Sequence, residues 1–541
     1  MNTNFKYQIK SYLIFVSISI FILLIYNKFS PSLTNFYFKY QKGFFAIELP
    51  FYILLSSTFY FSKLKNKFLK YIFPTIPLIS SFLAFDIFYS FLSKSPRYSD
   101  FENISTIYDF DFFMFFSAIL YLALIMILIV TVFIKAKKVY TKNQYITSLF
   151  FKLITLLCII LILQSKIFDN YQNNFFQYFS WSTKDTIKKN GRIASFIYYS
   201  KLENKNKAIL NKQKSNKIDV ANTLYKNKIK SKQNIYCVIL ESFINPNYIT
   251  NANYNPNPIS KELNQYLPNN DFSHLISPIY GGGTAQAEFE LLSGIKAFAK
   301  VNSIEFNALE GNEIKSFLYQ LKKNGYNTLA TIGTNSKYYN SRSAYKSLGF
   351  NKTIFLEEEI NFKRNKKDKK IFDGDLFQYN IKTIKKYLQN QNKPIFNYVL
   401  GMYGHKSYKR NKIDRPDVIT LKNVKNDALF RISNQFYYRT KALAQYIKEI
   451  LLLDPNALII ISSDHLPPIL NDKNLHYKYD KYTNSALIID KGKPLNIPKI
   501  HQYEVPWMIW DILSKSKVQR KYTTKTLEEL YFKSLYNSLK R

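Results

Sequence analysis

The chain contains 541 residues, of which 47% are hydrophobic and 17% aromatic, and it carries a formal net charge of +39. Its two cysteines exclude a disulfide framework and a cysteine-based metal site. The lysines are scattered and match no nucleic-acid recognition motif. We therefore expect no nucleic-acid partner and instead expect the chain to lie near anionic lipid or polymer.

Five apolar segments occupy the first third of the chain. They cover residues 12–26, 44–61, 71–92, 112–134 and 146–163. Each approaches or exceeds the roughly 20 residues with which a helix spans a bilayer. A cleaved signal peptide is the alternative for the first segment, but four more segments follow and no small-residue cleavage site stands out. The pattern predicts a five-helix transmembrane domain over residues 1–165.

The charges between these segments predict their orientation. Lysines lie before the first segment (Lys6, Lys10), after the second (Lys63, Lys65, Lys67, Lys70) and after the fourth (Lys135, Lys137, Lys138, Lys142). The loop after the third segment instead carries Asp100, Glu102, Asp109 and Asp111. By the positive-inside rule the N-terminus is cytoplasmic, and with five spans everything after about residue 165 is extracytoplasmic. We expect a multi-pass protein of the cell membrane.

Two carboxylates, Glu48 and Asp86, fall within or near the apolar segments. An ionisable residue at membrane depth is a candidate for a functional site. The alternatives are an interfacial position for Glu48, and a helix cap or a pairing within the bundle for Asp86.

Residues 166–232 predict a juxtamembrane connector. An aromatic run at 175–181 is followed by an amphipathic stretch at 189–202, which suits a membrane surface. The lysine- and asparagine-rich residues 204–232 predict a polar helix or tether.

Residues 233–541 predict a separate α/β domain. Apolar runs typical of buried strands cover residues 234–242, 327–333, 393–408 (ending in a loop) and 457–465, and helical spacing covers 313–326 and 436–452. Alternation of strands and helices at this spacing predicts a mostly parallel central sheet. In such sheets, ligands bind at the carboxyl ends of the strands.

A glycine-rich stretch, Gly281 to Gly283, leads into Thr284 and a helical pattern that ends at Gly294. Glycines permit a sharp turn and a close approach of the backbone to a ligand. The N-terminus of a helix stabilises anions, so a hydroxyl there is well placed to attack a phosphorus centre. A turn without chemistry is the alternative.

Polar side chains stand at the ends of three predicted strands. These residues are Glu241, His405, Asp464 and His465. Their oxygen and nitrogen atoms suit a divalent cation such as Mn²⁺, Mg²⁺ or Zn²⁺. Taken singly, each residue also has an ordinary explanation as a helix-terminal carboxylate, a turn residue or a loop histidine.

Five motifs occur in order behind the apolar segments: VILESF, YGGGTAQAEFELLSG, YKSLGF, MYGHKSY and SSDHLPP. Together they resemble the lipoteichoic acid synthase and phosphoglycerol transferase family, within the alkaline phosphatase/sulfatase superfamily. The resemblance covers nearly the whole chain. It implies a sulfatase-like extracytoplasmic catalytic domain over residues 233–541.

The resemblance also implies a chemistry. Glu241, Thr284, Asp464 and His465 would hold one divalent cation, Mn²⁺ or Mg²⁺, with Zn²⁺ as the alternative. Thr284 would attack a phospholipid similar to phosphatidylglycerol, expel diacylglycerol and carry the phosphoglycerol group covalently. An acceptor hydroxyl on a cell-envelope glycan or polymer would then receive the group. His405 would bind the phosphate or protonate a leaving oxygen.

The family grips its substrate with an arginine and an aromatic residue upstream of the YKSLG-like stretch. In this chain the implied residues are Arg342 and Tyr339, or its neighbour Tyr338. The arginine is displaced by one position from the usual spacing and the family's tryptophan is absent, so the head group stays open. Thr284 cannot be converted to formylglycine, which excludes sulfatase activity.

Other functions compete with phosphoglycerol transfer. A phosphoethanolamine transferase or phosphodiesterase of the same superfamily is one alternative, although such transferases usually have two metal sites and several cysteines. A non-catalytic membrane protein that binds anionic polymer through its lysines is an alternative of another class. A transporter is a weaker one, because intramembrane charges are few and no internal repeat is visible.

Overall fold

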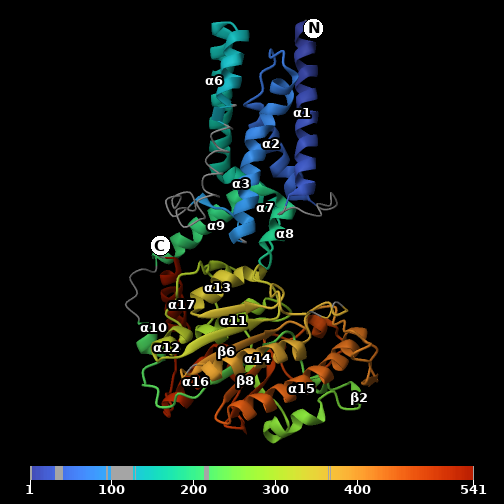
Figure 1. The fold of residues 1–541 in the computed structure, drawn as a ribbon, viewed down its shortest axis with the longest axis vertical. Coiled ribbons are helices and arrows are strands. Elements are labelled where there is room, and N and C mark those ends of the chain that lie inside the picture. The colour runs from blue at the N-terminus through green and yellow to red at the C-terminus, as the bar shows by residue number, and fades with distance from the viewer. Residues whose placement is uncertain are drawn as a thin grey trace. The chain divides into compact units, whose positions relative to one another are not determined.

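The structure is a computed structural model that describes residues 3–30, 41–92, 95–98, 126–127, 129–212, 219–363, 365, 367–390 and 392–539. The chain divides into two compact units, Met1–Lys205 and Asn206–Arg541 (Figure 1).

The described part of the first unit is helical. Its helices are α1 (Thr3–Phe29), α2 (Leu49–Ser57), α3 (Ile76–Leu92), α6 (Lys142–Gln164), α7 (Lys166–Phe175), α8 (Thr183–Asn190) and α9 (Arg192–Lys212), the last continuing past the unit boundary. Two π-helical turns, Phe44–Glu48 and Phe68–Ile72, precede α2 and α3. Serine and threonine side chains cap α6 and α7, since Thr141 and Ser165 accept from backbone N–H groups of the first turn.

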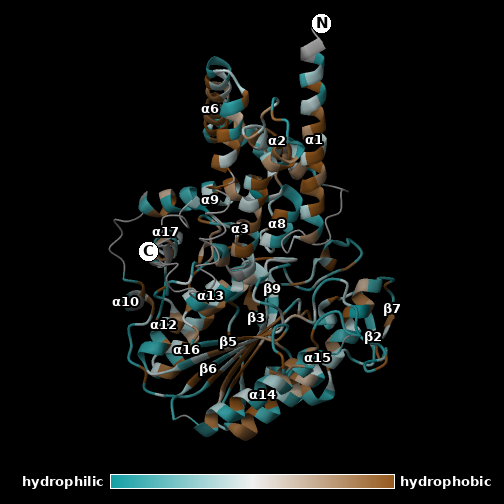
Figure 2. Ribbon diagram, turned by 45° about the horizontal axis from the view of Figure 1, so that its top comes forward, coloured by the Kyte–Doolittle hydropathy of each residue, from teal (hydrophilic) through white to brown (hydrophobic). Residues whose placement is uncertain are grey.

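Three helical stretches are long and apolar enough to cross a membrane: Lys6–Phe29, Phe68–Ser90 and Lys142–Gln164. They overlap the first, third and fifth predicted segments, and Figure 2 shows the hydrophobic residues along α1 and α6 in brown. The second segment forms only a shorter apolar helix, Phe44–Ser57, because the chain leaves the helix in a turn at Thr58. The fourth, 112–134, lies largely outside the described residues. The described chain thus holds three candidate spans instead of the predicted five.

A buried ion pair joins α9 to α3 within the first unit. Arg192 and Asp86 are 1% and 0% exposed. The Arg192 Nε and Nη2 atoms donate to the two Asp86 carboxylate oxygens at 2.9 and 2.8 Å, and Nη1 donates to Asn27 Oδ1 at 2.9 Å. Glu48 accepts from the backbone N–H groups of Arg192 and Ile193 at 2.9 and 2.6 Å, so it caps α9. Both carboxylates therefore have structural partners.

Replacing Arg192 with leucine is expected to destabilise the first unit by about 3–5 kcal/mol, because it leaves the Asp86 carboxylate buried without its cation. Thermal unfolding of the full chain in detergent measures the change. Lys201→Leu is the matched control, because Lys201 pairs with Asp169 while 34% exposed and such pairs contribute less than about 1 kcal/mol. Equal effects of the two substitutions would contradict the expected cost of the buried pair.

The second unit contains a nine-stranded sheet and a two-stranded sheet. The strands are β1 (Ile235–Leu240), β2 (Asn253–Asn255), β3 (Ser273–Ile276), β4 (Asn327–Ile332), β5 (Lys352–Phe355), β6 (Ile395–Gly401), β7 (Thr420–Lys422), β8 (Leu458–Ser463), β9 (Thr483–Asp490), β10 (Lys493–Leu495) and β11 (Ile500–His501). The helices are α10 (Val220–Leu224), α11 (Thr284–Ser293), α12 (Phe317–Lys323), α13 (Ser341–Leu348), α14 (Asp373–Asn390), α15 (Asp427–Leu453), α16 (Val505–Ser514) and α17 (Thr524–Leu539).

The large sheet is mixed, where a mostly parallel one was predicted. Its order is β11-β3-β9-β8-β1-β6-β4-β5, with β10 on β9. The five strands from β8 to β5 are parallel to one another, as expected. However, β9 is antiparallel to both β8 and β3. The reason is that the segment between β8 and β9 contains a single 3₁₀ turn, Pro468–Asn471, and no crossover helix that would return the chain to a parallel start.

The central strand β1 is buried on both faces, which explains its continuous apolar sequence. Ile235, Cys237 and Ile239 pack into one hydrophobic core together with α11, α12, α16 and α17. The alternate residues Tyr236, Val238 and Leu240 pack into a second core with α14 and α15 (Figure 1). The sheet therefore separates two helical layers, and its strand ends are held from both sides.

Candidate active site

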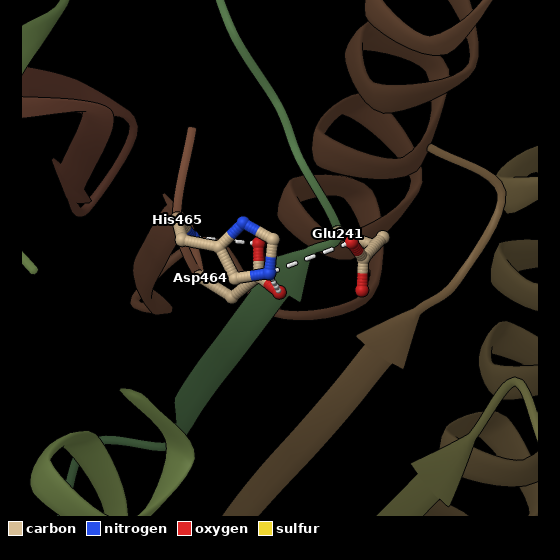
Figure 3. Close-up of side chains that lie close together, drawn as sticks. All are labelled: Glu241, Asp464 and His465. Carbon is tan, nitrogen blue, oxygen red and sulfur yellow. Dashed lines mark hydrogen bonds and ion pairs between the residues drawn. The ribbon is translucent and has the colours of Figure 1, made fainter. Parts of the chain in front are cut away.

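The register of the sheet brings three predicted site residues together. Leu240 at the end of β1 pairs with Ser463 at the end of β8, so Glu241 and Asp464 emerge side by side and His465 follows. The ligand atoms of these three residues all lie within 4.8 Å of one another (Figure 3). His465 Nε2 is 3.3 Å from Asp464 Oδ2 and 3.6 Å from Glu241 Oε1.

The donor atoms of this cluster fit a divalent cation. His465 Nδ1 lies 3.0 Å from the Leu466 carbonyl oxygen, which can only accept, so Nδ1 carries the proton and Nε2 presents its lone pair in the neutral ring. Asp464 Oδ1 accepts from the N–H groups of Ser242 and His465 at 2.8 and 2.7 Å. Asp464 Oδ2 and His465 Nε2 are buried and form no hydrogen bond with any described residue. Two carboxylates and one imidazole with unused lone pairs suit Mn²⁺, Mg²⁺ or Zn²⁺.

The electrostatics of the cluster favour a bound cation. Burial raises the pKa of Asp464 to about 7, and the Glu241 charge acts in the same direction. Burial also raises the pKa of Glu241, but His465 and His405 lower it more, so it stays below the ordinary value. The two carboxylates repel each other, so a bound cation would stabilise the form in which both are charged.

Thr284 reaches the cluster from the glycine-rich turn. Gly281, Gly282 and Gly283 have φ of 76, 151 and 93°, a region that other residues rarely adopt. This backbone places Thr284 at the first position of α11, where its Oγ1 donates to Glu241 Oε2 at 3.0 Å. The hydroxyl thus contacts the candidate cation ligand Glu241 and lies at the N-terminus of a helix.

His405 and Tyr339 border the cluster. Half-buried His405 lies on the loop after β6; burial lowers its pKa, with Glu241 opposing and Lys370 and Lys369 reinforcing the shift. Tyr339 has a φ of 46°, and its side chain is partly buried. Burial raises the Tyr339 pKa, and the charges of Glu241 and Asp464 raise it further. The motifs did not predict that these two lysines act on His405.

The Arg342 side chain is hydrogen-bonded to Ser336 and Glu358 in this structure. Its Nη2 donates to Ser336 Oγ at 2.8 Å and to Glu358 Oε2 at 2.9 Å, and its side chain is 63% exposed. A role for Arg342 in binding the head group stays a prediction.

Two glutamates of the EFE motif hold α11 in place, a role that sequence reasoning missed. Glu288 Oε1 accepts from the hydroxyls of Tyr345 and Tyr398 at 2.5 and 2.7 Å. Glu290 accepts from the Ala297 N–H at 2.9 Å. Charged residues on an otherwise apolar helix were the available signal, because a carboxylate is seldom buried without specific donors.

The stability of the second unit is expected to fall as pH rises from about 4.5 to about 8. Burial raises the pKa of Glu290 to about 8, with Glu305 adding to the shift and the Ala297 N–H and Lys296 opposing it. The folded state therefore holds a proton that the unfolded chain has released, so unfolding becomes easier through this window. Thermal unfolding at pH 5 and pH 8 measures it. Glu290→Gln should reduce the slope and the exposed control Glu262→Gln should leave it intact; an unchanged slope in Glu290→Gln would contradict the assignment.

Comparison with known proteins identifies a family and proteins that are similar in sequence or in structure. The sulfatase family model matches residues 233–531. A protein of Rhizobium meliloti (strain 1021) whose name assigns it to cyclic beta-1,2-glucan modification is 24% identical over 288 residues, which are 52% of this chain and 42% of that protein. The chain thus spans less than half the length of this curated relative.

Two similar solved structures are proteins of Listeria monocytogenes and Streptococcus pyogenes. The lipoteichoic acid synthase LtaP of Listeria monocytogenes gives a TM-score of 0.45 at 16% identity, covering 55% of this chain and 78% of that one. The phosphoglycerol transferase GacH of Streptococcus pyogenes, solved with sn-glycerol-1-phosphate, gives 0.43 at 17% identity, covering 62% and 92%.

Proposed function

The chain belongs to the sulfatase family, and from this membership we propose that it is a membrane-bound transferase. It moves a phosphoglycerol-type group from a phospholipid to an acceptor hydroxyl on a cell-envelope glycan or polymer, through a covalent intermediate on Thr284. The observation that carries the proposal is the contact of the Thr284 hydroxyl with Glu241, inside a buried cluster of two carboxylates and one imidazole. The donor class rests on the resemblance of the five motifs to the lipoteichoic acid synthase family.

In the proposed reaction the Thr284 oxygen forms a bond to the donor phosphorus, and the bond from phosphorus to the diacylglycerol oxygen breaks. Glu241 Oε2 accepts the hydrogen bond of Thr284 and so lies in position to take its proton. His405 stands at the border of the site, where it can supply a proton to the departing oxygen. The oxygen of an acceptor hydroxyl then forms a bond to the same phosphorus, and the bond from phosphorus to the Thr284 oxygen breaks. His405, which gave up its proton in the first step, takes the proton of the acceptor hydroxyl, and Glu241 returns its proton to Thr284.

Glu241, Asp464, His465 and the Thr284 oxygen would hold one divalent cation, Mn²⁺ or Mg²⁺. When bound, the cation lowers the pKa of the attacking hydroxyl and stabilises charge on the phosphorus oxygens. Threonine cannot become the formylglycine that sulfatases use, so the family describes the fold and not sulfate-ester hydrolysis.

The proposed organisation follows the charge pattern. Residues 1–165 form the membrane domain with a cytoplasmic N-terminus, 166–232 the juxtamembrane connector, and 233–541 the extracytoplasmic catalytic domain. The catalytic residues then face the leaflet and the envelope polymers outside the cell membrane. Accessibility of engineered cysteines at residues 3 and 392 from opposite sides of the membrane tests this arrangement.

Mass spectrometry of the peptide that contains Thr284 tests the function. The full chain is incubated with Mn²⁺ and mixed vesicles of phosphatidylglycerol and phosphatidylethanolamine. A mass increase equal to phosphoglycerol on Thr284 is the expected result. A phosphoethanolamine adduct would instead identify phosphatidylethanolamine as the donor. Absence of any adduct together with absence of diacylglycerol release would refute the proposal.

A further inference from the structure

A second buried ion pair lies behind the candidate active site, and the proposed reaction gives it no role. Arg439 on α15 and Asp373 at the start of α14 are 2% and 0% exposed. Arg439 Nε donates to Asp373 Oδ2 at 2.6 Å. The guanidinium carbon also lies 5.1 Å from the ring centroid of Phe243, two residues after Glu241. The pair therefore sits at the carboxyl edge of the sheet, between two helices and the end of β1.

The guanidinium contacts the backbone on both sides of the site. Arg439 Nη2 donates to the carbonyl oxygen of Glu241 at 2.9 Å. A methyl group placed on Gly404 would overlap both this carbonyl oxygen and Arg439 Nη1. Gly404 directly precedes His405. One planar side chain thus lies against the main chain of a candidate cation ligand and against the main chain next to the candidate phosphate-binding histidine.

Such an ion pair is poorly explained by stability alone. A buried pair is often no more stabilising than well-packed apolar residues, because two charges must leave water. Its particular property is geometric: the guanidinium presents several N–H donors in a rigid plane, which lysine cannot reproduce. Arg439 uses this plane to meet the Asp373 carboxylate and the Glu241 carbonyl at once, in the space that the glycine leaves open.

We propose that Arg439 is a positioning residue, whose guanidinium, held by Asp373, packs the Glu241 main chain against Gly404 and so sets the spacing between the cation ligand Glu241 and His405. The catalytic part of this inference rests on the proposed function. The part that concerns the Glu241 ligand does not, because cation affinity can be measured without any turnover.

The test compares three variants of the full chain in detergent: Arg439→Lys, Gly404→Ala, and the control Lys441→Met on the same helix, whose side chain is 57% exposed. Titration calorimetry with Mn²⁺ gives the cation affinity, and diacylglycerol release gives kcat and KM. Arg439→Lys and Gly404→Ala are each expected to weaken Mn²⁺ binding roughly 10- to 100-fold, as expected for loss of a group that orients a metal ligand. They should lower kcat more than they change KM, and Lys441→Met should change neither.

Gly404→Ala keeps every charge and still crowds the contact between Arg439 and the Glu241 carbonyl oxygen. This variant therefore tests the positioning role if Arg439→Lys does not fold. Wild-type Mn²⁺ affinity in a folded Gly404→Ala or Arg439→Lys variant would overturn the inference. If the wild-type chain binds Mn²⁺ but releases no diacylglycerol, the proposed function fails while the Mn²⁺ titrations still test the positioning role.

Discussion

Replacing Thr284 with alanine is expected to lower diacylglycerol release from labelled phosphatidylglycerol by at least about 10³-fold, the scale on which removal of a catalytic nucleophile acts. The reason is local: Thr284 Oγ1 contacts Glu241 Oε2 at 3.0 Å, at the N-terminus of α11, and alanine brings no atom that could bond to phosphorus. The backbone of the glycine turn does not depend on the hydroxyl, so the fold should persist.

Thr284→Ser is the matched control for this substitution, because serine restores an oxygen at the same position without the methyl group. Serine should recover most of the activity and still yield a covalent adduct. Ser293→Ala removes a hydroxyl at the other end of α11, where it donates to the Phe289 carbonyl oxygen, and should leave the chemistry intact. Undiminished release from Thr284→Ala would sink the covalent mechanism, whatever the other variants do.

Removal of divalent cations is the second large effect. Treatment with a chelator is expected to abolish diacylglycerol release and to lower the thermal unfolding midpoint, because Glu241 and Asp464 are then left as adjacent buried carboxylates. Readdition of Mn²⁺ or Mg²⁺ should restore both; at a cation concentration 100 times the dissociation constant, binding stabilises the folded state by about 2.7 kcal/mol.

Asp464→Asn separates the charge of the cluster from its shape. The substitution removes one of the two carboxylates, so Mn²⁺ affinity should fall at least about 10-fold. The cation-free variant should unfold at the same temperature as the cation-free wild type or above it, because the like-charge repulsion is gone. Asp427→Asn, on a residue whose side chain is 71% exposed, is the control. Unaltered cation affinity in Asp464→Asn would remove Asp464 from the ligand set.

The strand ends were predictable because burial on both faces leaves a plain signal. A continuous apolar run such as residues 235–240, followed at once by Glu241, indicates a parallel strand that ends at a ligand site. The pairing of Leu240 with Ser463 was not predictable, since register depends on contacts between residues that are distant in the chain. The antiparallel orientation of β9 was not predicted for the same reason, because an apolar run does not indicate whether a strand is parallel or antiparallel to its neighbours.

The residues around the cluster were harder to place from sequence. Tyr339 and Asn340 both have positive φ, which single-residue preferences disfavour, so the direction of this loop follows from its tertiary contacts. Arg342 donates a hydrogen bond to Glu358, and no sequence pattern near either residue predicts this contact. Likewise, the ion pair of Asp86 with Arg192 joins a residue of a candidate span to a residue of the predicted connector. The sequence pattern of each segment alone does not predict this contact.

The two residues of the Asp86–Arg192 pair are synthesised at different times during translation. Asp86 leaves the ribosome 106 residues before Arg192, an interval of roughly 5–20 s at ordinary rates of translation. Two donors to the Asp86 carboxylate are made earlier still: the Tyr26 and Ser30 hydroxyls, each at 2.7 Å in the finished fold. The Tyr26 and Ser30 hydroxyls are therefore available to the Asp86 carboxylate before Arg192 has been synthesised. The Arg192 guanidinium at the start of α9 is the last of these donors to be made.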